Sequence, residues 1–267
     1  MQINDKVFVV TGGGSGIGRA LVLALLAGGA RVAALDINED ALRETVQLAG
    51  DKADQVSIHV VNVTDRKKVE ALPAAVIKQH GAVDGLINNA GIIQPFVPVK
   101  DLDYAAIERV MNVNFYGQLY LIKAFLPELL KRPEAHIVNV SSMGGFFPFP
   151  GQTLYGASKA AVKLLTEGLY TELLDTNVGV TVAFPGATAT NISQNSGIEM
   201  AGMDAEASSF PMTSAEDAAQ QILDAITKNK FQVFVGRDSK LMSLLYKISP
   251  RWATGFMQKQ MKGMLPE

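Results

Sequence analysis

Seven short runs of apolar residues recur along the chain, and helix-length segments of mixed polarity separate them. The runs have strand length and lie at 6–10, 31–35, 56–61, 83–88, 136–140, 179–184 and 232–236. Continuous apolar runs of this kind are typical of strands covered on both faces. Helices are expected between them, at 17–28, 39–49, 66–79, 102–131, 154–176 and 214–228. This alternation predicts an α/β fold, with a doubly wound parallel sheet of about seven strands in three α/β/α layers.

The bulk composition is that of a folded chain and excludes several kinds of function. With 267 residues, the chain has room for one α/β domain, placed at 1–236, and a C-terminal extension at 237–267. A content of 48% hydrophobic and 19% charged residues excludes an intrinsically disordered protein. The formal net charge of −2 gives no reason to expect nucleic-acid binding. The lack of cysteine excludes disulfides, and the scattered His59, His80 and His136 predict no metal site.

The first ten residues, MQINDKVFVV, run almost directly into a strand and show no signal-peptide pattern. No window of the chain reaches 18 consecutive apolar residues, the minimum expected of a membrane-spanning helix. We therefore expect a cytoplasmic protein.

Candidate chemistry is expected where the strands end, because ligands of doubly wound sheets bind beyond the carboxyl ends of the strands. The segment TGGGSGIG at 11–18 follows the first strand and opens a helix. Its glycines allow the backbone to approach a pyrophosphate that rests on the helix N-terminus. A tight connection alone explains such a turn, but Asp36 also ends the second strand, where an acid binds the adenine ribose. Together they predict a dinucleotide site.

The segment QTLYGASK at 152–159 places Tyr155 and Lys159 one helical turn apart on the same face. A half-buried tyrosine beside a solvated lysine would explain this pair equally well, so the spacing alone is weak. Its weight depends on the other motifs of the chain.

Those motifs, in their order, resemble the short-chain dehydrogenase/reductase family in its compact single-domain branch. The likeness covers roughly residues 5–236 and implies a Rossmann fold. It rests on TGGGSGIG at 11–18, NVTD at 62–65, NNAG at 88–91, Asn114 within MNVNFYG, VSS at 140–142, YGASK at 155–159 and PGATAT at 185–190.

The resemblance implies a catalytic set of four residues. Tyr155 would be the acid/base, Ser142 would hydrogen-bond the reacting oxygen, and Lys159 would bind the cofactor ribose. Because a free tyrosine has a pKa near 10, the neighbouring ammonium and the positive nicotinamide ring together are expected to lower the Tyr155 pKa. Asn114 would hold a water leading from Lys159 to solvent.

Two register alternatives remain within this set. Ser141 is the alternative to Ser142, and Asn112 is the alternative to Asn114. The separation of Ser142 from Tyr155 favours Ser142, and the distance of Asn114 from FYG favours Asn114.

The same resemblance implies an NAD site. Its residues would be Gly12, Ser15, Gly16, Ile17, Gly18, Asp36, Ile37, Asn62, Val63, Asn89, Gly91, Tyr155, Lys159, Pro185, Gly186, Thr188 and Thr190. Many relatives carry Val or Ile at the position of Thr188. We expect NAD rather than NADP, because Asp36 would repel a 2′-phosphate while Ser15 and Ile37 offer no positive charge. Arg19 and Arg43 are expected to have solvated or structural roles.

Substrate-binding residues are expected between and around the catalytic residues. They would be Ser142, Gly144, Phe149, Gln152, Ile93 and Gln94, covered by a lid at 191–212. Since the lid has no Lys or Arg, we expect an apolar, medium-sized alcohol or ketone as substrate. The residues at 102–131 and 154–176 are expected to form a homodimer or homotetramer.

The tail beyond residue 236 carries an excess of Lys and Arg, and its apolar residues are spaced like two helices broken at Pro250. Packing on a partner subunit or over the cleft is the first interpretation, and contact with a membrane surface is the second.

The predicted function is NAD-dependent interconversion of a secondary alcohol and a ketone. The alternatives are a 3-oxoacyl reductase, which would prefer NADPH, a nucleotide-sugar epimerase or dehydratase, and a membrane-associated steroid or retinoid dehydrogenase. From another class, the chain could be a catalytically silent dinucleotide-binding sensor.

Overall fold

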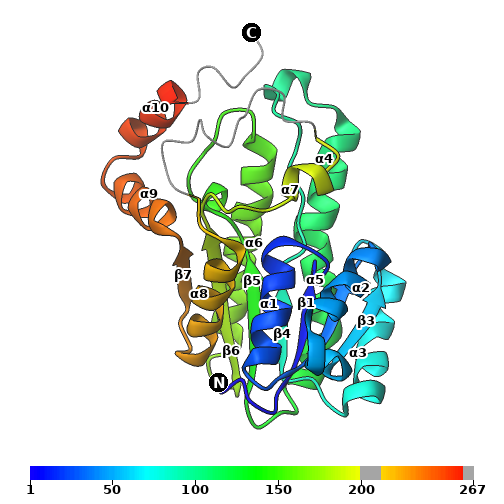
Figure 1. The fold of residues 1–267 in the computed structure, drawn as a ribbon. Coiled ribbons are helices and arrows are strands. Elements are labelled where there is room, and N and C mark those ends of the chain that lie inside the picture. Colours follow the sequence, from blue (N-terminus) through cyan, green and yellow to red (C-terminus); the bar gives the residue numbers. More distant parts are fainter. Residues whose placement is uncertain (199–211, 261–267) are drawn as a thin grey trace.

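The computed structural model describes residues 1–198 and 212–260 and contains one sheet of seven parallel strands (Figure 1). The strand order is β3-β2-β1-β4-β5-β6-β7, so the order reverses between β1 and β4. The strands are β1 (Val7–Thr11), β2 (Arg31–Asp36), β3 (Val56–Val60), β4 (Gly85–Asn88), β5 (Ala135–Val140), β6 (Val178–Pro185) and β7 (Gln232–Val235). The prediction of a doubly wound parallel sheet of about seven strands is confirmed.

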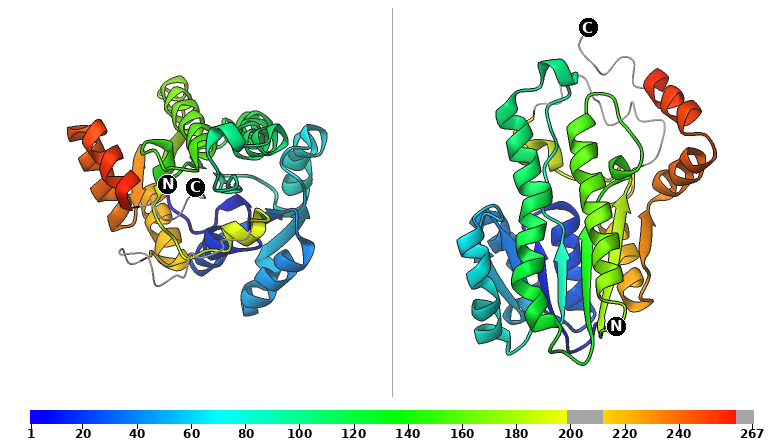
Figure 2. Two further views of the ribbon diagram at one scale, coloured as in Figure 1. Left: turned by 90° about the horizontal axis from the view of Figure 1, so that it is seen from above. Right: turned by 180° about the vertical axis from the view of Figure 1, so that it is seen from behind.

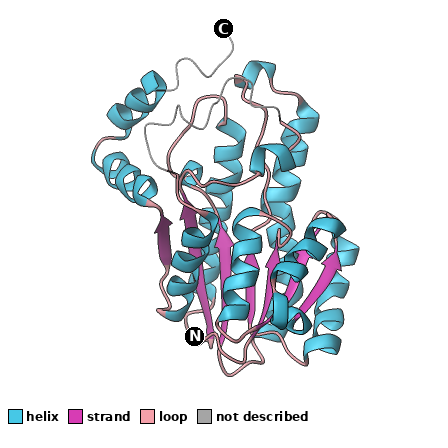
Figure 3. Ribbon diagram, in the orientation of Figure 1, coloured by secondary structure: helices cyan, strands magenta, loops and turns pink. Residues whose placement is uncertain are grey.

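Helices cover both faces of this sheet and give three layers (Figures 1 and 3). They are α1 (Gly16–Ala27), α2 (Glu39–Leu48), α3 (Arg66–His80), α4 (Tyr104–Met111), α5 (Gln118–Leu129), α6 (Thr153–Glu172), α7 (Ile192–Asn195), α8 (Ala215–Thr227), α9 (Arg237–Ile248) and α10 (Pro250–Gln260). The helices α1, α2 and α8 lie on one face, and α3, α5 and α6 lie on the other (Figure 2). Among the described helices, none is both long and apolar enough to span a membrane.

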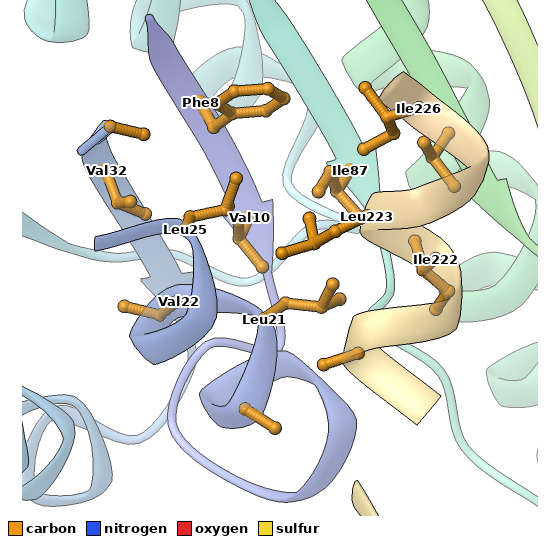
Figure 4. Close-up of a cluster of buried hydrophobic side chains, with 14 of the residues drawn as sticks. Phe8, Val10, Leu21, Val22, Leu25, Val32, Ile87, Ile222, Leu223 and Ile226 are labelled. Carbon is orange, nitrogen blue, oxygen red and sulfur yellow. The ribbon is translucent and has the colours of Figure 1, made fainter. Parts of the chain in front are cut away.

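Two apolar clusters hold the layers together. The first contains fully buried Phe8 and Val10 of β1, Leu21 and Leu25 of α1, and Ile222 of α8 (Figure 4). The second lies on the opposite face of the same strands, between the sheet and α3, α5 and α6. Because successive side chains of a strand point to opposite faces, β1 supplies both clusters, which explains its uninterrupted apolar sequence.

The helix predicted at 102–131 is in fact two helices joined by a π-helical turn at Asn112–Gly117. Such a turn holds one residue more than an α-helical turn and is common at functional sites. Asn114 lies in it, fully buried, and its side chain bonds to both the N–H and the carbonyl of Ile92. The turn stays helical and adds only one residue, so the spacing of apolar residues in the sequence does not show where one helix ends and the next begins.

The tail forms the two predicted helices, α9 and α10, with the break at Pro250. Its buried residues Met242 and Ala253 pack with Met143 and Phe147, which follow β5. At its start, Asp238 accepts a bond from the Ala187 N–H at 2.6 Å. Ser239 donates a bond to the Phe184 carbonyl at 2.7 Å. The tail is therefore joined to the end of β6, across the boundary predicted at 236.

Candidate active site

A cleft of about 860 Å³ opens at the carboxyl ends of the strands, beside β1, where the strand order reverses. Ligands bind at this point in doubly wound folds. Predicted cofactor residues that line it are Gly12, Ser15, Gly16, Ile17, Asp36, Ile37, Asn62, Val63, Asn89, Gly91 and Thr190. The structure therefore brings residues from five separate motifs to one cavity.

The glycine-rich turn leaves room for a ligand on the N-terminus of α1. Gly12 and Gly16 have positive φ values of 69° and 51°, which side chains other than glycine rarely adopt. A Cβ on Gly18 would lie 1.9 Å from the Gly12 carbonyl oxygen, so the turn and the helix are packed backbone to backbone. These features fit a bound pyrophosphate, since free N–H groups at the helix N-terminus attract anions.

Asp36 lies at the rim of the cleft, held by the backbone around it. One carboxylate oxygen accepts a bond from Gly14 N at 3.0 Å, and the other accepts one from Asn38 N at 3.1 Å. The neighbouring side chain, Ile37, is 67% exposed and carries no charge. The carboxylate is thus fixed beside the cleft, and the residue that follows it carries no positive charge.

The guanidinium groups of the two nearby arginines, Arg19 and Arg43, are paired with glutamates. The guanidinium of Arg19 donates to the Gly14 carbonyl and pairs with Glu44 at 2.6 Å. Arg43 pairs with Glu39 on the exposed side of α2. Both geometries match the structural or solvated roles expected from the sequence.

Six predicted cofactor residues do not line the cleft: Tyr155 and Lys159, which are described below, and Gly18, Pro185, Gly186 and Thr188. Gly18 is buried in the first turn of α1. Pro185 ends β6, and a Cβ on Gly186 would lie 2.2 Å from the Asp238 carboxylate. Thr188 pairs with Thr213 in a short parallel bridge.

The predicted catalytic residues converge on the other side of the switch point. Ser142 follows β5, and Tyr155 and Lys159 lie on the first turns of α6. The Lys159 ammonium donates to the Val140 carbonyl at 3.0 Å and lies 6.0 Å from the centre of the Tyr155 ring. A Cβ on Gly91 would lie 3.0 Å from the same ammonium, so this group reaches the edge of the cleft.

Burial governs the proton affinities of this pair. It raises the pKa of Tyr155 above its usual value, while the hydrogen bond with Ser142 acts in the opposite direction. It also lowers the pKa of Lys159 to about 8. The lowering of the Tyr155 pKa expected from this ammonium together with the nicotinamide ring stays a prediction. The ammonium is bonded to a backbone carbonyl.

The two serines after β5 differ in what their hydroxyls contact. Ser141 is buried and donates to the Lys159 carbonyl at 2.7 Å, so it fastens α6 to the strand. The Ser142 hydroxyl accepts a bond from Gly144 N at 3.0 Å and contacts Tyr155. Asn114 lies behind these residues, where its amide donates to Ser158 at 3.0 Å. Asn112 instead lines the cleft.

Replacing Ser142 with alanine is expected to lower kcat roughly 10²–10³-fold, as for the loss of one oxyanion donor. Ser141→Ala is the matched control, because it removes a structural bond and should lower stability by about 1 kcal/mol with kcat nearly unchanged. Steady-state kinetics and thermal unfolding of both variants check this. A larger loss of kcat in Ser141→Ala would show that the register is wrong.

The predicted substrate residues divide into two groups. Gly144 contacts the Tyr155 ring, since a Cβ there would lie 3.2 Å from it, and Phe149 is half-buried against Phe147. Ile93, Gln94 and Gln152 are buried. The Gln94 amide is bonded to residues 151, 154 and 155. Gln94 therefore supports the start of α6 instead of lining an open surface.

Part of the predicted lid lies over the cleft. The Asn195 amide of α7 donates to the Ser15 hydroxyl at 2.8 Å. Arg109 of α4 donates to the Ser196 carbonyl, and the Ser196 hydroxyl accepts from Ile93 N. The remaining lid residues, 199–211, lie outside the described residues.

Sequence reasoning missed Arg109, Asn195 and Asp238 as residues that shape the site. Each acts through a contact between elements far apart in the chain, for which a single sequence carries no signal. No group of His, Asp and Glu in the described part of the chain could hold a metal ion.

The family model for short chain dehydrogenases matches residues 6–201, which is well over half of the chain. The chain belongs to the short-chain dehydrogenase/reductase family. Its predicted oxidoreductase class and Rossmann fold are thereby confirmed.

Two relatives and two solved structures of this family illustrate the likeness. SadH of Mycobacterium tuberculosis is 36% identical over 254 residues, 92% of each chain. The 3-oxoacyl-[acyl-carrier-protein] reductase FabG of Thermotoga maritima is 37% identical over 73% of this chain and 78% of its own length. A family member from Burkholderia phymatum in complex with NAD has a TM-score of 0.83 at 27% identity, covering 94% of this chain and 96% of its own. One from Burkholderia cenocepacia in complex with NADP has a TM-score of 0.81 at 27% identity, covering 96% of this chain and 99% of its own.

Proposed function

We propose that this short-chain dehydrogenase/reductase interconverts a secondary alcohol and a ketone with NAD as the cofactor. The observation that supports this most is the meeting of Ser142, Tyr155 and Lys159 beside a cleft whose rim carries the Asp36 carboxylate. The structural neighbours bound to NAD and to NADP support a nicotinamide dinucleotide. Asp36 with the uncharged Ile37 favours NAD between the two.

The residues present fit such a dinucleotide. The glycine turn would hold the pyrophosphate, Asp36 the adenine ribose, and Lys159 the ribose next to the nicotinamide. The bound nicotinamide would supply the acceptor or donor of hydride. The protein must then handle one proton on the substrate oxygen, because an alcohol loses it and a ketone gains it.

The side chains of this site perform that proton transfer. The Tyr155 hydroxyl takes the proton from the alcohol or gives it to the developing alkoxide. Ser142 donates a hydrogen bond to the same oxygen and stabilises its charge. Lys159, with its pKa at about 8, keeps a positive charge at neutral pH close to the tyrosine ring. That charge favours the phenolate when the tyrosine has given up its proton.

The substrate is proposed to be apolar and of medium size. The described segments around the catalytic residues, 143–152 and 191–198, contain no charged side chain. Phe146 and Phe149 are half-buried in the cluster that joins this loop to α9 and α10. An acidic or phosphorylated substrate would therefore have no cation in these two segments to bind it.

A panel of substrates tests both parts of this proposal. We expect secondary alcohols and ketones of medium size to turn over with NAD(H), followed by the absorbance of the reduced nicotinamide. Carboxylates and phosphate esters of matched size should have the lowest kcat/KM. A phosphorylated sugar as the best substrate would contradict the apolar substrate class.

A 3-oxoacyl reductase is the second candidate, because of the 37% identity with the reductase from Thermotoga maritima. A 3-oxoacyl thioester in the same panel distinguishes it. Preference for this thioester with NADPH would favour the 3-oxoacyl reductase. Turnover of simple ketones with NADH would favour the alcohol dehydrogenase proposed first.

A further inference from the structure

The outer side of α9 carries a stripe of exposed apolar residues. Leu241, Leu244 and Ile248 are 44%, 57% and 73% exposed. Their spacing of three and four residues places them on one helical face, opposite buried Met242 and Ser239. The helix is therefore apolar on two sides, and the described residues cover only the inner side.

An exposed tryptophan and a half-buried phenylalanine lie on α10, the helix that follows. Trp252 is 57% exposed and stacks on Phe256, with ring centres 5.7 Å apart. Tryptophan is enriched at the boundary between water and lipid, where its ring is buried and its N–H is hydrated. Both residues belong to α10, which lies at the outside of the molecule, away from the sheet, in Figures 1 and 2.

The charges beside the apolar stripe are all positive among the described residues of these helices. Their exposed cations are Arg237, Lys240, Lys247, Arg251 and Lys259. The acid Asp238 is buried and bonded to the Ala187 N–H. This local excess of positive charge, on a chain with a net charge of −2, attracts an anionic partner.

We propose that α9 and α10 dock on an anionic lipid surface. Apolar side chains flanked by Lys and Arg are the features of helices that lie in the headgroup region of a bilayer. A second copy of the chain, placed face to face on the same surface, would bring these cations against one another. This proposal does not depend on the proposed reaction.

Co-sedimentation with vesicles tests the docking. We expect binding to vesicles of phosphatidylcholine with phosphatidylserine, and weak binding to phosphatidylcholine alone. Lys240→Gln with Lys247→Gln should weaken binding roughly tenfold or more, at about 1 kcal/mol for each cation. Leu244→Ser with Ile248→Ser should weaken it also, and added salt should weaken the wild type.

Two controls keep the result specific to this face. Lys67→Gln with Lys68→Gln removes two exposed cations of α3, and Leu164→Ser removes an exposed leucine of α6. Neither should change vesicle binding. Equal binding by all variants, or no binding by the wild type, would overturn the proposal. Loss of a dimer on sedimentation of the Leu244 and Ile248 variant would assign the face to a second copy instead.

A separate observation concerns Gln94, which is fully buried beside the first turn of α6. Its side-chain carbonyl accepts bonds from the N–H groups of Leu154 at 2.7 Å and Tyr155 at 2.9 Å. Its amide donates to the Gly151 carbonyl at 2.8 Å. The N-cap residue of α6, Gln152, makes no capping bond with its own side chain and donates to the Gln94 backbone carbonyl instead.

We infer that Gln94 is a positioning residue for Tyr155. The first N–H groups of a helix have no partner within it, and an outside acceptor fixes how that turn is held. Here the acceptor binds the N–H of the acid/base residue itself. The inference rests on the proposed role of Tyr155, and its test includes a readout that does not require that role.

Gln94→Leu and Gln94→Glu together test this inference. A neutral carboxylic acid reproduces all three bonds of the amide, whereas leucine makes none. We expect Gln94→Leu to lower kcat about tenfold or more, with the dinucleotide affinity retained. Gln94→Glu should recover most of kcat at low pH and lose it as the introduced carboxyl ionises and repels the Gly151 carbonyl.

The exchange rate of the Tyr155 amide hydrogen in both variants gives the independent readout. It should rise in Gln94→Leu and stay low in Gln94→Glu at low pH. Slow exchange and full kcat in Gln94→Leu would overturn the positioning role. Slow exchange in the wild type and fast exchange in Gln94→Leu, with no activity in any variant, would support the bond and refute the proposed reaction instead.

Discussion

Replacement of Tyr155 by phenylalanine is expected to lower kcat/KM roughly 10²–10⁴-fold, the usual contribution of a general acid–base group. The ring and its packing against Gly144 remain, and only the hydroxyl that contacts Ser142 is lost. Dinucleotide binding, measured by calorimetry, should therefore survive. The two measurements together separate a loss of proton transfer from a loss of the site.

Tyr104→Phe is the matched control, because this substitution removes the same hydroxyl from a side chain that is 82% exposed. It should leave kcat/KM unchanged. Substantial residual turnover in Tyr155→Phe would mean that another group transfers the proton.

A preference for NAD(H) over NADP(H) of at least roughly a hundredfold in kcat/KM is the second large effect, equivalent to about 2.8 kcal/mol. The Asp36 carboxylate is fixed by two backbone N–H groups, so it cannot turn away from a 2′-phosphate without losing both bonds. Two like charges at close range repel strongly where solvent is limited. Arg19, the cation nearest to this turn, is already paired with Glu44.

Asp36→Ala combined with Ile37→Arg should narrow or reverse this preference, since it removes the repulsion and adds a cation at an exposed position. Kinetics with both cofactors measure it. Asp54→Ala serves as the control, because Asp54 is exposed in the segment Gly50–Gln55, which precedes β3 and lies at the opposite end of that strand from the cleft. Equal efficiency of the wild type with both cofactors would refute the role given to Asp36.

The strands were predictable because they lie between two helical layers. Burial on both faces of β1, for instance, requires an apolar run with no alternation, and residues 7–10 supply it. The π-helical turn was not predictable, because it depends on Asn114 reaching Ile92, more than twenty residues away in the chain. Residues 199–211 and 261–267, which include most of the lid, lie outside the described residues.

The site divides in the same way. Residues that act from the end of their own strand, such as Asp36 and Ser142, were found because strand ends mark the binding edge of the sheet. The bonds of Gln94 could not be predicted, because the sequence shows a polar residue after the NNAG motif but not that its side chain bonds to the start of α6. The pKa of Tyr155 needed the structure as well, since it depends on how deeply the ring is buried.

The contact between Asp238 and Ala187 has a practical consequence for producing shortened versions of this protein. A chain cut where the family match ends, at residue 201, would lack β7 and leave β6 as an unpaired edge, which promotes aggregation. A chain cut at 236 would keep the sheet but lose Asp238 and Ser239, which fasten the end of β6. Shortened chains should therefore extend at least to the end of α9, at residue 248, to give a well-behaved recombinant protein.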